Sequence, residues 1–359
     1  MKRFAAKRRP APTRKTGLPP GSLVHVGEVK TARPEITLME FDAGDVLERR
    51  FTSIAESRQH QPSKATVWLN VYGLHEPEVM AEIGRRFDLH PLVLEDILNT
   101  NQRPKIDDYD DYLYLVTHFF DYDAQAMRVS SDQVSMVVGR NFVLTFQERP
   151  TGCFDPVRER LRGNKGQIRK LGADYLAYSL LDAVVDRYFV VLDQLSDGVE
   201  RLEDELLERV TPDVMHAIHH FKRESLTLRR AVWPLREVLN TLQRGEASFF
   251  QPETLIYLRD VYDHTVHIIE SLDAMRDLMA GMLDMYLSSV SNRLNQEVRV
   301  LTVITTLFMP ATLISGIFGM NFRVMPWLEA PDGYLFALGL MALVALAMAM
   351  IFWRRRWMT

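Results

Sequence analysis

The strongest pattern in the chain is a pair of long uncharged, mostly apolar runs near its C-terminal end. The first run extends from Val300 to Met320 and the second from Tyr334 to Trp353, and neither contains Asp, Glu, Lys or Arg. A helix needs about 20 apolar residues to cross the hydrocarbon core of a bilayer. A buried helix of a soluble domain is normally shorter or keeps a polar face. The two runs therefore predict two membrane-spanning helices, joined by the connection 321–333.

Basic residues beside the two runs predict their orientation. Three arginines, from Arg354 to Arg356, follow the second run, and Arg293 and Arg299 precede the first. Because cytoplasmic ends of membrane helices are enriched in Lys and Arg, both ends are expected in the cytoplasm. The connection 321–333, with the acidic residues Glu329 and Asp332, would then lie outside. We expect a multi-pass protein of the cell (inner) membrane, with the bilayer as a partner.

The first run carries small and polar residues that recur at steps of three and four. Such residues in a membrane helix indicate close helix packing or a wet surface. The stripe has a period near 3.5 residues. Its members are Asn295, Val298, Thr302, Thr305, Met309, Thr312 and Gly316. If several copies surrounded an axis, this stripe would line it; ordinary packing against the second run is the alternative.

The first half of the chain alternates between strand-like and helix-like patterns. Helices are expected over Glu76–Phe87 and from Pro91, since Pro is favoured at the first helical position. Gly139, Arg140 and Asn141 form a hairpin turn signal between the last two predicted strands. The predicted strands are Leu23–Val29, Ile36–Phe41, Thr66–Val71, Tyr112–Phe120, Gln133–Val138 and Phe142–Gln147.

From about Gly172 the pattern is helical to the end of the chain. Pro212 begins a segment that runs to about Arg244 and that Pro234 is expected to kink. A helix from about Pro252 to Phe318 would be about 100 Å long and would pass unbroken into the membrane. The predicted class is therefore α+β, a cytoplasmic α/β domain and stalk helix with a two-helix transmembrane hairpin. The predicted divisions are a basic tail (1–22), the cytoplasmic α/β domain (23–170), a cytoplasmic helical hairpin (171–251), the stalk helix continuous with the first membrane helix (252–320, membrane part 300–320), the outer connection (321–333), the second membrane helix (334–353) and the basic C-terminus (354–359).

Composition narrows the possible partners. Charged residues make up 25% of the chain and the formal net charge is -4, so no nucleic-acid partner is expected. Cys153 is the only cysteine, which excludes an internal disulfide and a four-cysteine zinc site. Residues 1–22 are basic and proline-rich but lack the apolar core of a secretory signal. We expect a disordered tail there, with contact to anionic lipid as the alternative.

The sequence contains no recognisable enzyme signature. The chain contains no phosphate-binding loop, no G-x-S-x-G and no H-E-x-x-H. Two histidine groups have a spacing that could bind zinc, although histidines on a solvated helix are commoner. They are His216, His219 and His220, and His264 with His267.

Motifs around the end of the first run resemble one transporter family. Phe308–Pro310 (FMP) and Ser315–Phe322 (SGIFGMNF) resemble the CorA magnesium channels, in which a Gly-Met-Asn triplet ends the first of two C-terminal spans. Here the triplet is Gly319, Met320 and Asn321. Leu92–Asp107 and Tyr257–Asn292 are also similar to that family, and the resemblance extends from about Leu23 onward.

The resemblance implies a funnel-shaped homopentamer that carries Mg²⁺, with Co²⁺ as a further cargo, and that needs no cofactor. The triplet would select the ion at the outer mouth. The implied pore-lining residues are Asn295, Val298, Leu301, Thr305, Met309, Thr312 and Gly316. Cytoplasmic Mg²⁺ would close the channel by binding between subunits. The implied regulatory ligands are Glu95, Asp96, Asp182 and Asp260.

This chain departs from the family pattern at the pore mouth. Most members have Tyr where Phe318 stands, and many have an acidic residue where Trp327 follows Met325 and Pro326. Two other functions remain open. One is a zinc or cobalt/nickel transporter of the same superfamily, against which Met320 argues because the zinc branch tends to have Ile there. The other is a membrane-anchored helical scaffold or sensor without transport.

Overall fold

The computed structural model describes residues 17–51, 53–58, 60–245, 249–320, 323 and 331–355. These residues form two compact units. The first unit combines the chain up to Asp204 with His216–Met279. The second combines Glu205–Met215 with the chain from Ala280 onward.

The first unit is built on a seven-stranded sheet with the strand order β2-β1-β3-β7-β6-β5-β4. All neighbouring strands are antiparallel except β3 and β7, which are parallel. The strands are β1 (Glu35–Phe41), β2 (Val46–Phe51), β3 (Thr66–Tyr72), β4 (Lys105–Asp108), β5 (Tyr112–Asp123), β6 (Arg128–Gly139) and β7 (Phe142–Gln147).

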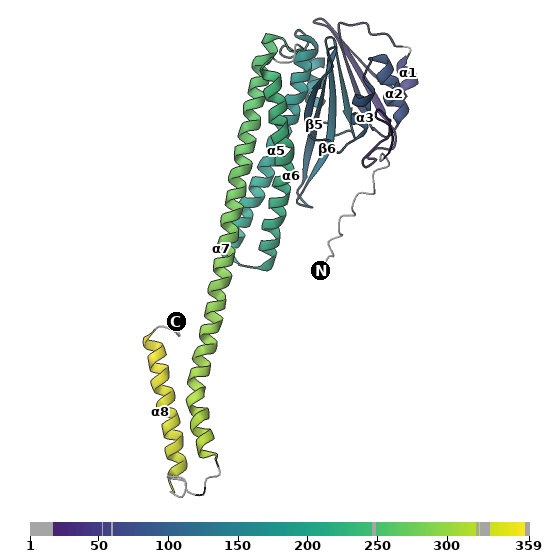
Figure 1. Ribbon diagram of the computed structural model, residues 1–359. Coiled ribbons are helices and arrows are strands. Elements are labelled where there is room, and N and C mark those ends of the chain that lie inside the picture. Colours follow the sequence, from purple (N-terminus) through teal and green to yellow (C-terminus); the bar gives the residue numbers. More distant parts are fainter. Residues whose placement is uncertain are drawn as a thin grey trace. The chain divides into compact units, whose positions relative to one another are not determined.

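Short helices flank the sheet, and long helices follow it along the chain (Figure 1). Four short helices belong to the α/β part: α1 (Ile54–Arg58), α2 (Pro77–Arg86), α3 (Pro91–Leu98) and α4 (Asp155–Arg162). Four long helices follow: α5 (Gly172–Glu208), α6 (Pro212–Gln243), α7 (Pro252–Phe318) and α8 (Gly333–Arg354).

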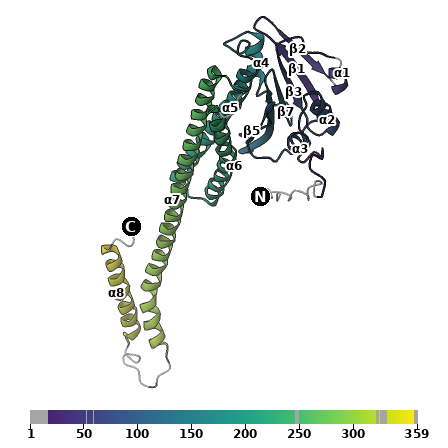
Figure 2. The same cartoon turned by 45° about the horizontal axis from the view of Figure 1, so that its top comes forward.

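The core of the first unit lies on both faces of the sheet. On one face, α2 and α3 bury residues such as Met80, Ile83 and Ile97 against the strands. On the other, the Tyr188 ring of α5 packs against Phe120 with ring centroids 5.3 Å apart. Figures 1 and 2 both show α5 and α6 on the side of the sheet opposite α2 and α3. Because strand side chains alternate between faces, one sheet can bind helices on both sides.

Most predicted elements of the first half are confirmed, and one is wrong. No strand forms over Leu23–Val29; only Val26 makes an isolated bridge, to Asn99. This segment lies beside α3 as a coil, where Leu23 packs against the core without strand pairing. The sequence did not predict β2 or β4, because Glu48, Arg49 and Arg50 interrupt the apolar alternation in β2 and β4 has only four residues.

Among the described residues, two helices are long and apolar enough to cross a membrane, α7 and α8. The second unit contains α8 and the part of α7 from Ala280 onward. Figures 1 and 2 show α8 beside the C-terminal part of α7. On α8 the covered positions include Gly333, Ala337 and Phe352, on one helical face. The half-buried positions of α7 in this region are Val303, Thr306, Leu307, Pro310, Ala311, Ile314 and Phe318.

The long helix α7 is continuous over 67 residues. At 1.5 Å per residue its length is about 100 Å. Its first half contributes to the first unit and its last part to the second. The expected helix from about Pro252 to Phe318 is thus confirmed. The expected helical segment from Pro212 is also confirmed as α6, which contains Pro234.

Candidate functional site

The polar stripe of α7 lies on the face that is not covered by the rest of the chain. Its members Thr302, Thr305, Thr312 and Gly316 are exposed, and Met309 is 64% exposed. The half-buried positions of α7 centre on the opposite side of the helix at 100° per residue. The stripe therefore points away from the face that carries the covered positions. This burial pattern disfavours packing against α8 as the reason for the stripe.

Three threonine hydroxyls near or on this stripe donate to the helix backbone. Thr305 Oγ1 donates to the Leu301 carbonyl at 2.8 Å, and Thr312 Oγ1 to the Phe308 carbonyl at 3.0 Å. Thr302 Oγ1 donates to the Val298 carbonyl at 2.8 Å. A hydroxyl that donates its hydrogen to a carbonyl can still accept hydrogen bonds through its lone pairs. The exposed oxygens thus suit the hydrogens of water around a cation.

The Gly-Met-Asn triplet begins where α7 ends. The Gly319 amide donates to the Ser315 carbonyl at 2.9 Å, and the Met320 amide to the Ile317 carbonyl at 3.2 Å. Asn321 and Glu329 lie outside the described residues. Asp332 directly precedes α8, where its carbonyl accepts from the Phe336 amide at 3.0 Å.

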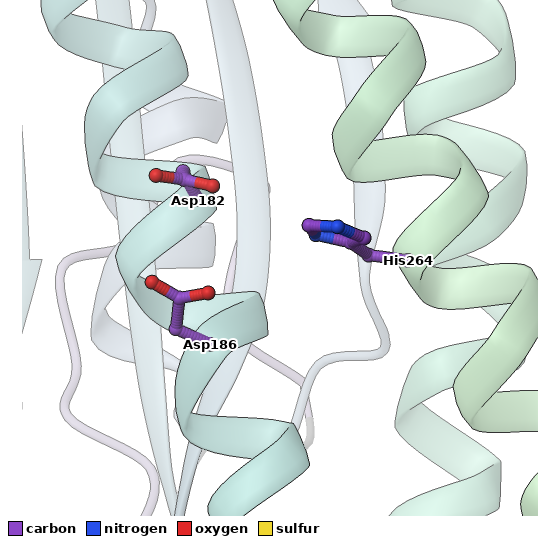
Figure 3. Close-up of side chains that lie close together, drawn as sticks. All are labelled: Asp182, Asp186 and His264. Atoms are coloured by element: carbon purple, nitrogen blue, oxygen red, sulfur yellow. The ribbon is translucent and has the colours of Figure 1, made fainter.

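A second candidate site lies between α5 and α7 in the first unit (Figure 3). Asp182 and Asp186 project from adjacent turns of α5 toward His264 of α7. One potential ligand atom from each of the three lies within 4.8 Å of the others. Burial, and next the charge of Asp186, raise the pKa of Asp182 to about 6. A bound cation would relieve this cost, since it stabilises the ionised form.

Asp260 lies next to this cluster, one turn before His264 on α7. Its carboxylate is 3.8 Å from His264 Nε2, and its side chain is 67% exposed. Asp182 is much less exposed, at 17%, and its nearest cation is Arg160 at 3.9 Å. The two predicted regulatory residues Asp182 and Asp260 therefore lie in one region, one shielded and one open.

The other two predicted regulatory residues lie elsewhere in the same chain. Glu95 and Asp96 are on α3, across the sheet from α5 (Figure 2). The Glu95 carboxylate accepts a hydrogen bond from the Gly21 amide. Asp96 pairs with Lys105 Nζ at 2.7 Å. One chain does not bring all four carboxylates together.

One member of the α5–α7 cluster, Asp186, was not found from the sequence, and His264 was grouped with His267 instead of with the aspartates. A sequence signal for this cluster existed. Asp182 and Asp186 are four residues apart on one predicted helix, and so are Asp260 and His264, which places each pair on one helical face. The spacing of His264 and His267 instead suggested a zinc site between them. Both rings pack against Phe189, with centroids 5.5 and 5.9 Å away. Within the described part of the chain, no metal-binding group of three forms around His216, His219 and His220.

Comparison with known proteins agrees with this geometry. The CorA-like Mg²⁺ transporter family model matches residues 63–356. The chain is 44% identical over 344 residues to the cobalt/magnesium transport protein CorA of Thermotoga maritima, covering 96% of this chain and 98% of the relative. It is 32% identical to the putative metal ion transporter YfjQ of Bacillus subtilis, covering 85% and 94%.

Solved structures show the same fold. The complete CorA magnesium transporter of Methanocaldococcus jannaschii aligns with a TM-score of 0.76 and 22% identity, covering 89% of this chain and 97% of that one. Full-length CmaX aligns with a TM-score of 0.71 and 22% identity, covering 92% and 100%. Together with the two candidate membrane helices, these matches indicate a membrane protein. The chain belongs to the CorA-like Mg²⁺ transporter family.

Proposed function

We propose that this chain transports Mg²⁺ and Co²⁺ passively into the cytoplasm, through a pore built from several copies of α7. The observation that carries this proposal is the Thr305–Gly316 face, which is polar, uncovered and directly followed by the Gly-Met-Asn triplet. Its near full-length relative from Thermotoga maritima is a cobalt/magnesium transport protein. Membership of a transporter family also fits the lack of an enzyme signature in the sequence.

One helix cannot enclose a pore, so the function needs an assembly. Copies of α7 around an axis would bring Thr305, Met309, Thr312 and Gly316 into rings. Five copies is the number that the family resemblance implies. Rings of Leu301 and Met309, which are 65% and 64% exposed, would close the pore by excluding water.

Selection is assigned to the triplet at the outer mouth. Mg²⁺ releases its water reluctantly and prefers octahedral oxygen geometry. A ring of Asn321 carboxamides can accept hydrogen bonds from the water shell without stripping it. A ring of carboxylates would hold a divalent ion more tightly, whereas conduction needs sites that release the ion. Glu329 and Asp332 would attract cations to the mouth.

The membrane potential supplies the driving force. With both termini in the cytoplasm, as Arg299 and Arg354 favour, cations enter toward the negative side. A potential of 100 mV is worth about 4.6 kcal/mol for a doubly charged ion. No nucleotide is required.

Cytoplasmic Mg²⁺ would close the channel by bridging neighbouring copies. Asp260 is open to solvent, and Glu95 and Asp96 lie on the other side of their own sheet. A cation held by Asp260 of one copy and Asp96 of the next would therefore join two chains. When the cation leaves, the carboxylates repel and the closed arrangement is destabilised.

Replacing Asn321 with Ala tests the selectivity role. Purified Asn321→Ala protein in liposomes should lose Mg²⁺ uptake while it keeps the oligomeric mass of the unmodified protein. Leu343→Ala is the matched control, because Leu343 is 66% exposed on α8 and is not assigned to the pore. Normal uptake by Asn321→Ala would refute the role of the carboxamide.

Competition between ions separates magnesium transport from the zinc and cobalt/nickel alternatives. Mg²⁺ uptake should be blocked by Co²⁺ and little affected by Zn²⁺ at equal concentration. Uptake of Zn²⁺ without uptake of Mg²⁺ would favour the zinc alternative. A protein that carries no ion would be the scaffold or sensor.

A further inference from the structure

Asp96, one of the carboxylates proposed to bind cytoplasmic Mg²⁺, is already held by two groups of its own chain. Lys105 Nζ lies 2.7 Å from Asp96 Oδ2. The side-chain amide of Gln102 donates a hydrogen bond to the other carboxylate oxygen, Asp96 Oδ1. Each oxygen can accept a further partner, so the charge of the first partner decides what else Asp96 can bind.

The ammonium group of Lys105 is held in this position by its surroundings. Lys105 and Asp107 are two residues apart on β4, so their side chains lie on one face of the strand. Lys105 Nζ is 2.6 Å from Asp107 Oδ2. It also lies over the ring of Tyr114 on β5, 5.3 Å from the ring centroid, which is a favourable cation–π distance. Groups from two strands and from α3 thus hold one positive charge beside Asp96.

Lys105 keeps its charge at neutral pH. Burial favours the neutral amine, but hydrogen bonds to Asp107 and Asp96 outweigh it and raise the pKa of Lys105 above its ordinary value. The side chain is 32% exposed, so water and salt screen its charge only in part. Asp96 therefore has a permanent cation beside it, whatever the concentration of free ions.

Mg²⁺ and this ammonium group disfavour each other at Asp96. Two cations on one carboxylate repel, and the repulsion is stronger where the site is partly buried. Lysine carries its charge on a flexible four-carbon stem, so Lys105 can leave Asp96 and remain paired with Asp107. The arrangement therefore suits an exchange, in which Mg²⁺ takes Asp96 and the lysine keeps Asp107.

We propose that Lys105 is an internal competitor of cytoplasmic Mg²⁺ for Asp96, and that it sets the Mg²⁺ concentration at which the channel closes. The inference rests on the proposed closure of the channel by Mg²⁺ at Asp96. A tethered group has a constant effective concentration at its site, whereas the concentration of free Mg²⁺ changes. Closure then requires enough Mg²⁺ to displace the lysine.

A purely structural role for Lys105 makes the opposite prediction. The Lys105–Asp96 pair joins β4, an edge strand of the sheet, to α3. If Lys105 only positioned Asp96, removing its charge would weaken the binding of Mg²⁺. Competition requires that the same change strengthen it. The direction of the change separates the two roles.

Inhibition of the Lys105→Gln variant by internal Mg²⁺ tests the competition, since glutamine removes the charge and keeps a hydrogen-bond donor. In liposomes, this variant should reach half-inhibition at an internal Mg²⁺ concentration at least about fivefold lower than the unmodified protein, the lower end of typical coupling between sites. Lys64→Gln is the matched control. Lys64 also joins two aspartates, Asp42 at 3.1 Å and Asp45 at 3.7 Å, at the opposite edge of the sheet. This control should keep the inhibition of the unmodified protein.

The Asp96→Asn background supplies a second control. There Lys105→Gln should cause no further change in inhibition, because the carboxylate for which the two cations compete is absent. Half-inhibition of the single Lys105→Gln variant at an unchanged or higher Mg²⁺ concentration, in an assembly of intact mass, would overturn the competition and leave the proposed function standing.

Mg²⁺-dependent unfolding gives a readout that needs no ion flux. An ion that binds the folded protein raises the unfolding temperature, and in Lys105→Gln this rise should need at least about fivefold less Mg²⁺. An unchanged Mg²⁺ dependence would overturn the competition. If the unmodified protein carries no ion, the proposed function fails, and the unfolding measurement still decides whether Lys105 competes. If Lys105→Gln does not assemble, Lys105→Met replaces it in both measurements.

Discussion

At the scale of single residues, the surroundings of Asp182 destabilise its ionised carboxylate in the metal-free chain. It is 17% exposed, faces Asp186 and has a raised pKa of about 6. A carboxylic acid with a raised folded-state pKa is destabilising when ionised. This free-energy cost to folding is fully present above the folded-state pKa and disappears below the unfolded-state pKa of about 3.9.

Asp182→Asn should therefore stabilise the metal-free protein at pH 7.5, by about 1–2 kcal/mol after allowance for solvent. The gain should shrink below pH 6 and vanish near pH 4. Thermal unfolding of the full chain in detergent and chelator measures this. Exposed Asp277→Asn is the control. A stabilisation that is independent of pH would contradict the assignment.

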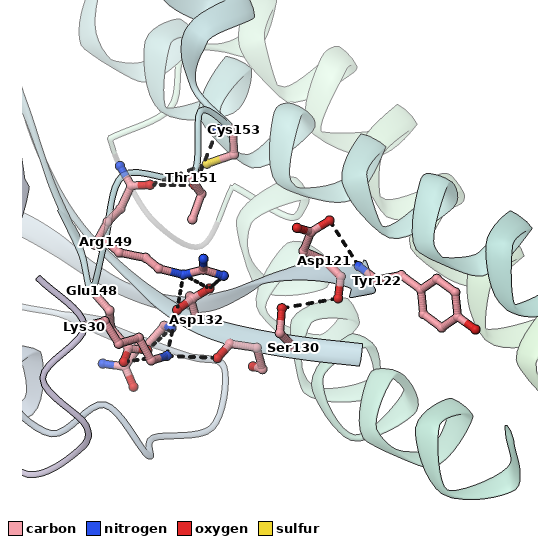
Figure 4. Close-up of polar contacts among 12 residues, drawn as sticks. Lys30, Asp121, Tyr122, Ser130, Asp132, Glu148, Arg149, Thr151 and Cys153 are labelled. Atoms are coloured by element: carbon pink, nitrogen blue, oxygen red, sulfur yellow. Dashed lines mark hydrogen bonds and ion pairs between the residues drawn. The ribbon is translucent and has the colours of Figure 1, made fainter. Parts of the chain in front are cut away.

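Lys30 joins two buried carboxylates, that of Asp132 on β6 and that of Glu148 directly after β7 (Figure 4). Its Nζ lies 2.6 Å from Asp132 and 2.8 Å from Glu148, whose side chains are 3% and 5% exposed. Burial favours the neutral acid, but hydrogen bonds from Arg149 and Lys30 keep the pKa of Asp132 below its ordinary value. The network stabilises the folded state above the unfolded pKa of Asp132 and loses this effect as the pH falls through the folded pKa.

Lys30→Met should destabilise the protein by about 2–3 kcal/mol at pH 7, because it leaves Glu148 buried without its cation. Part of the difference should disappear as the pH falls through the folded pKa of Asp132, because the protonated acid no longer carries the charge that Lys30 neutralises. Unfolding midpoints between pH 7 and pH 3 test this, with the exposed Lys170→Met as control. Equal stability of the Lys30 variant and the control at pH 7 would exclude the network's role.

At the scale of elements, α7 connects the proposed regulatory residue Asp260 with the proposed pore. Its 67 residues have no break, so displacement at one end can reach the other along hydrogen-bonded backbone. Asp260→Ala should leave Mg²⁺ entry intact but weaken its inhibition by Mg²⁺ on the cytoplasmic side. Unchanged inhibition would remove Asp260 from the regulatory site.

Breaking α7 between these regions should uncouple them. Ser288 is exposed, and proline inside a helix costs about 3 kcal/mol and removes a backbone hydrogen bond. Ser288→Pro should make Mg²⁺ flux insensitive to internal Mg²⁺, whereas Ser288→Ala should behave like the unmodified protein. Flux at low and high internal Mg²⁺ is the measurement, and retained inhibition in Ser288→Pro would contradict transmission along the helix.

The sequence predicted long elements better than short ones. The bounds of α7 followed from Pro252 and from the absence of helix-breaking residues up to Phe318. The edge strand β2 could not be predicted, because Arg49 and Arg50 face solvent and interrupt the apolar alternation. The edge strand β4 could not be predicted because it has only four residues. The pattern of apolar residues along a sequence reflects which side chains are buried, and edge strands bury few side chains.

At the scale of the whole molecule, the two candidate sites differ in what sequence could reveal. The stripe from Thr305 to Gly316 follows from helical periodicity, because all its members lie on one helix. The grouping of Asp182, Asp186 and His264 depends on how α5 and α7 pack, which no local pattern encodes.

Voltage-driven uptake is the direct test of whether this protein is a passive Mg²⁺ channel. Purified protein in liposomes, without nucleotide and with low internal Mg²⁺, is given a potassium diffusion potential while internal Mg²⁺ is followed by a fluorescent indicator. A passive channel closed by internal Mg²⁺ predicts Mg²⁺ entry that increases as the interior is made more negative and that falls as internal Mg²⁺ accumulates. Absence of entry, or entry that does not respond to the potential, would contradict a passive Mg²⁺ channel.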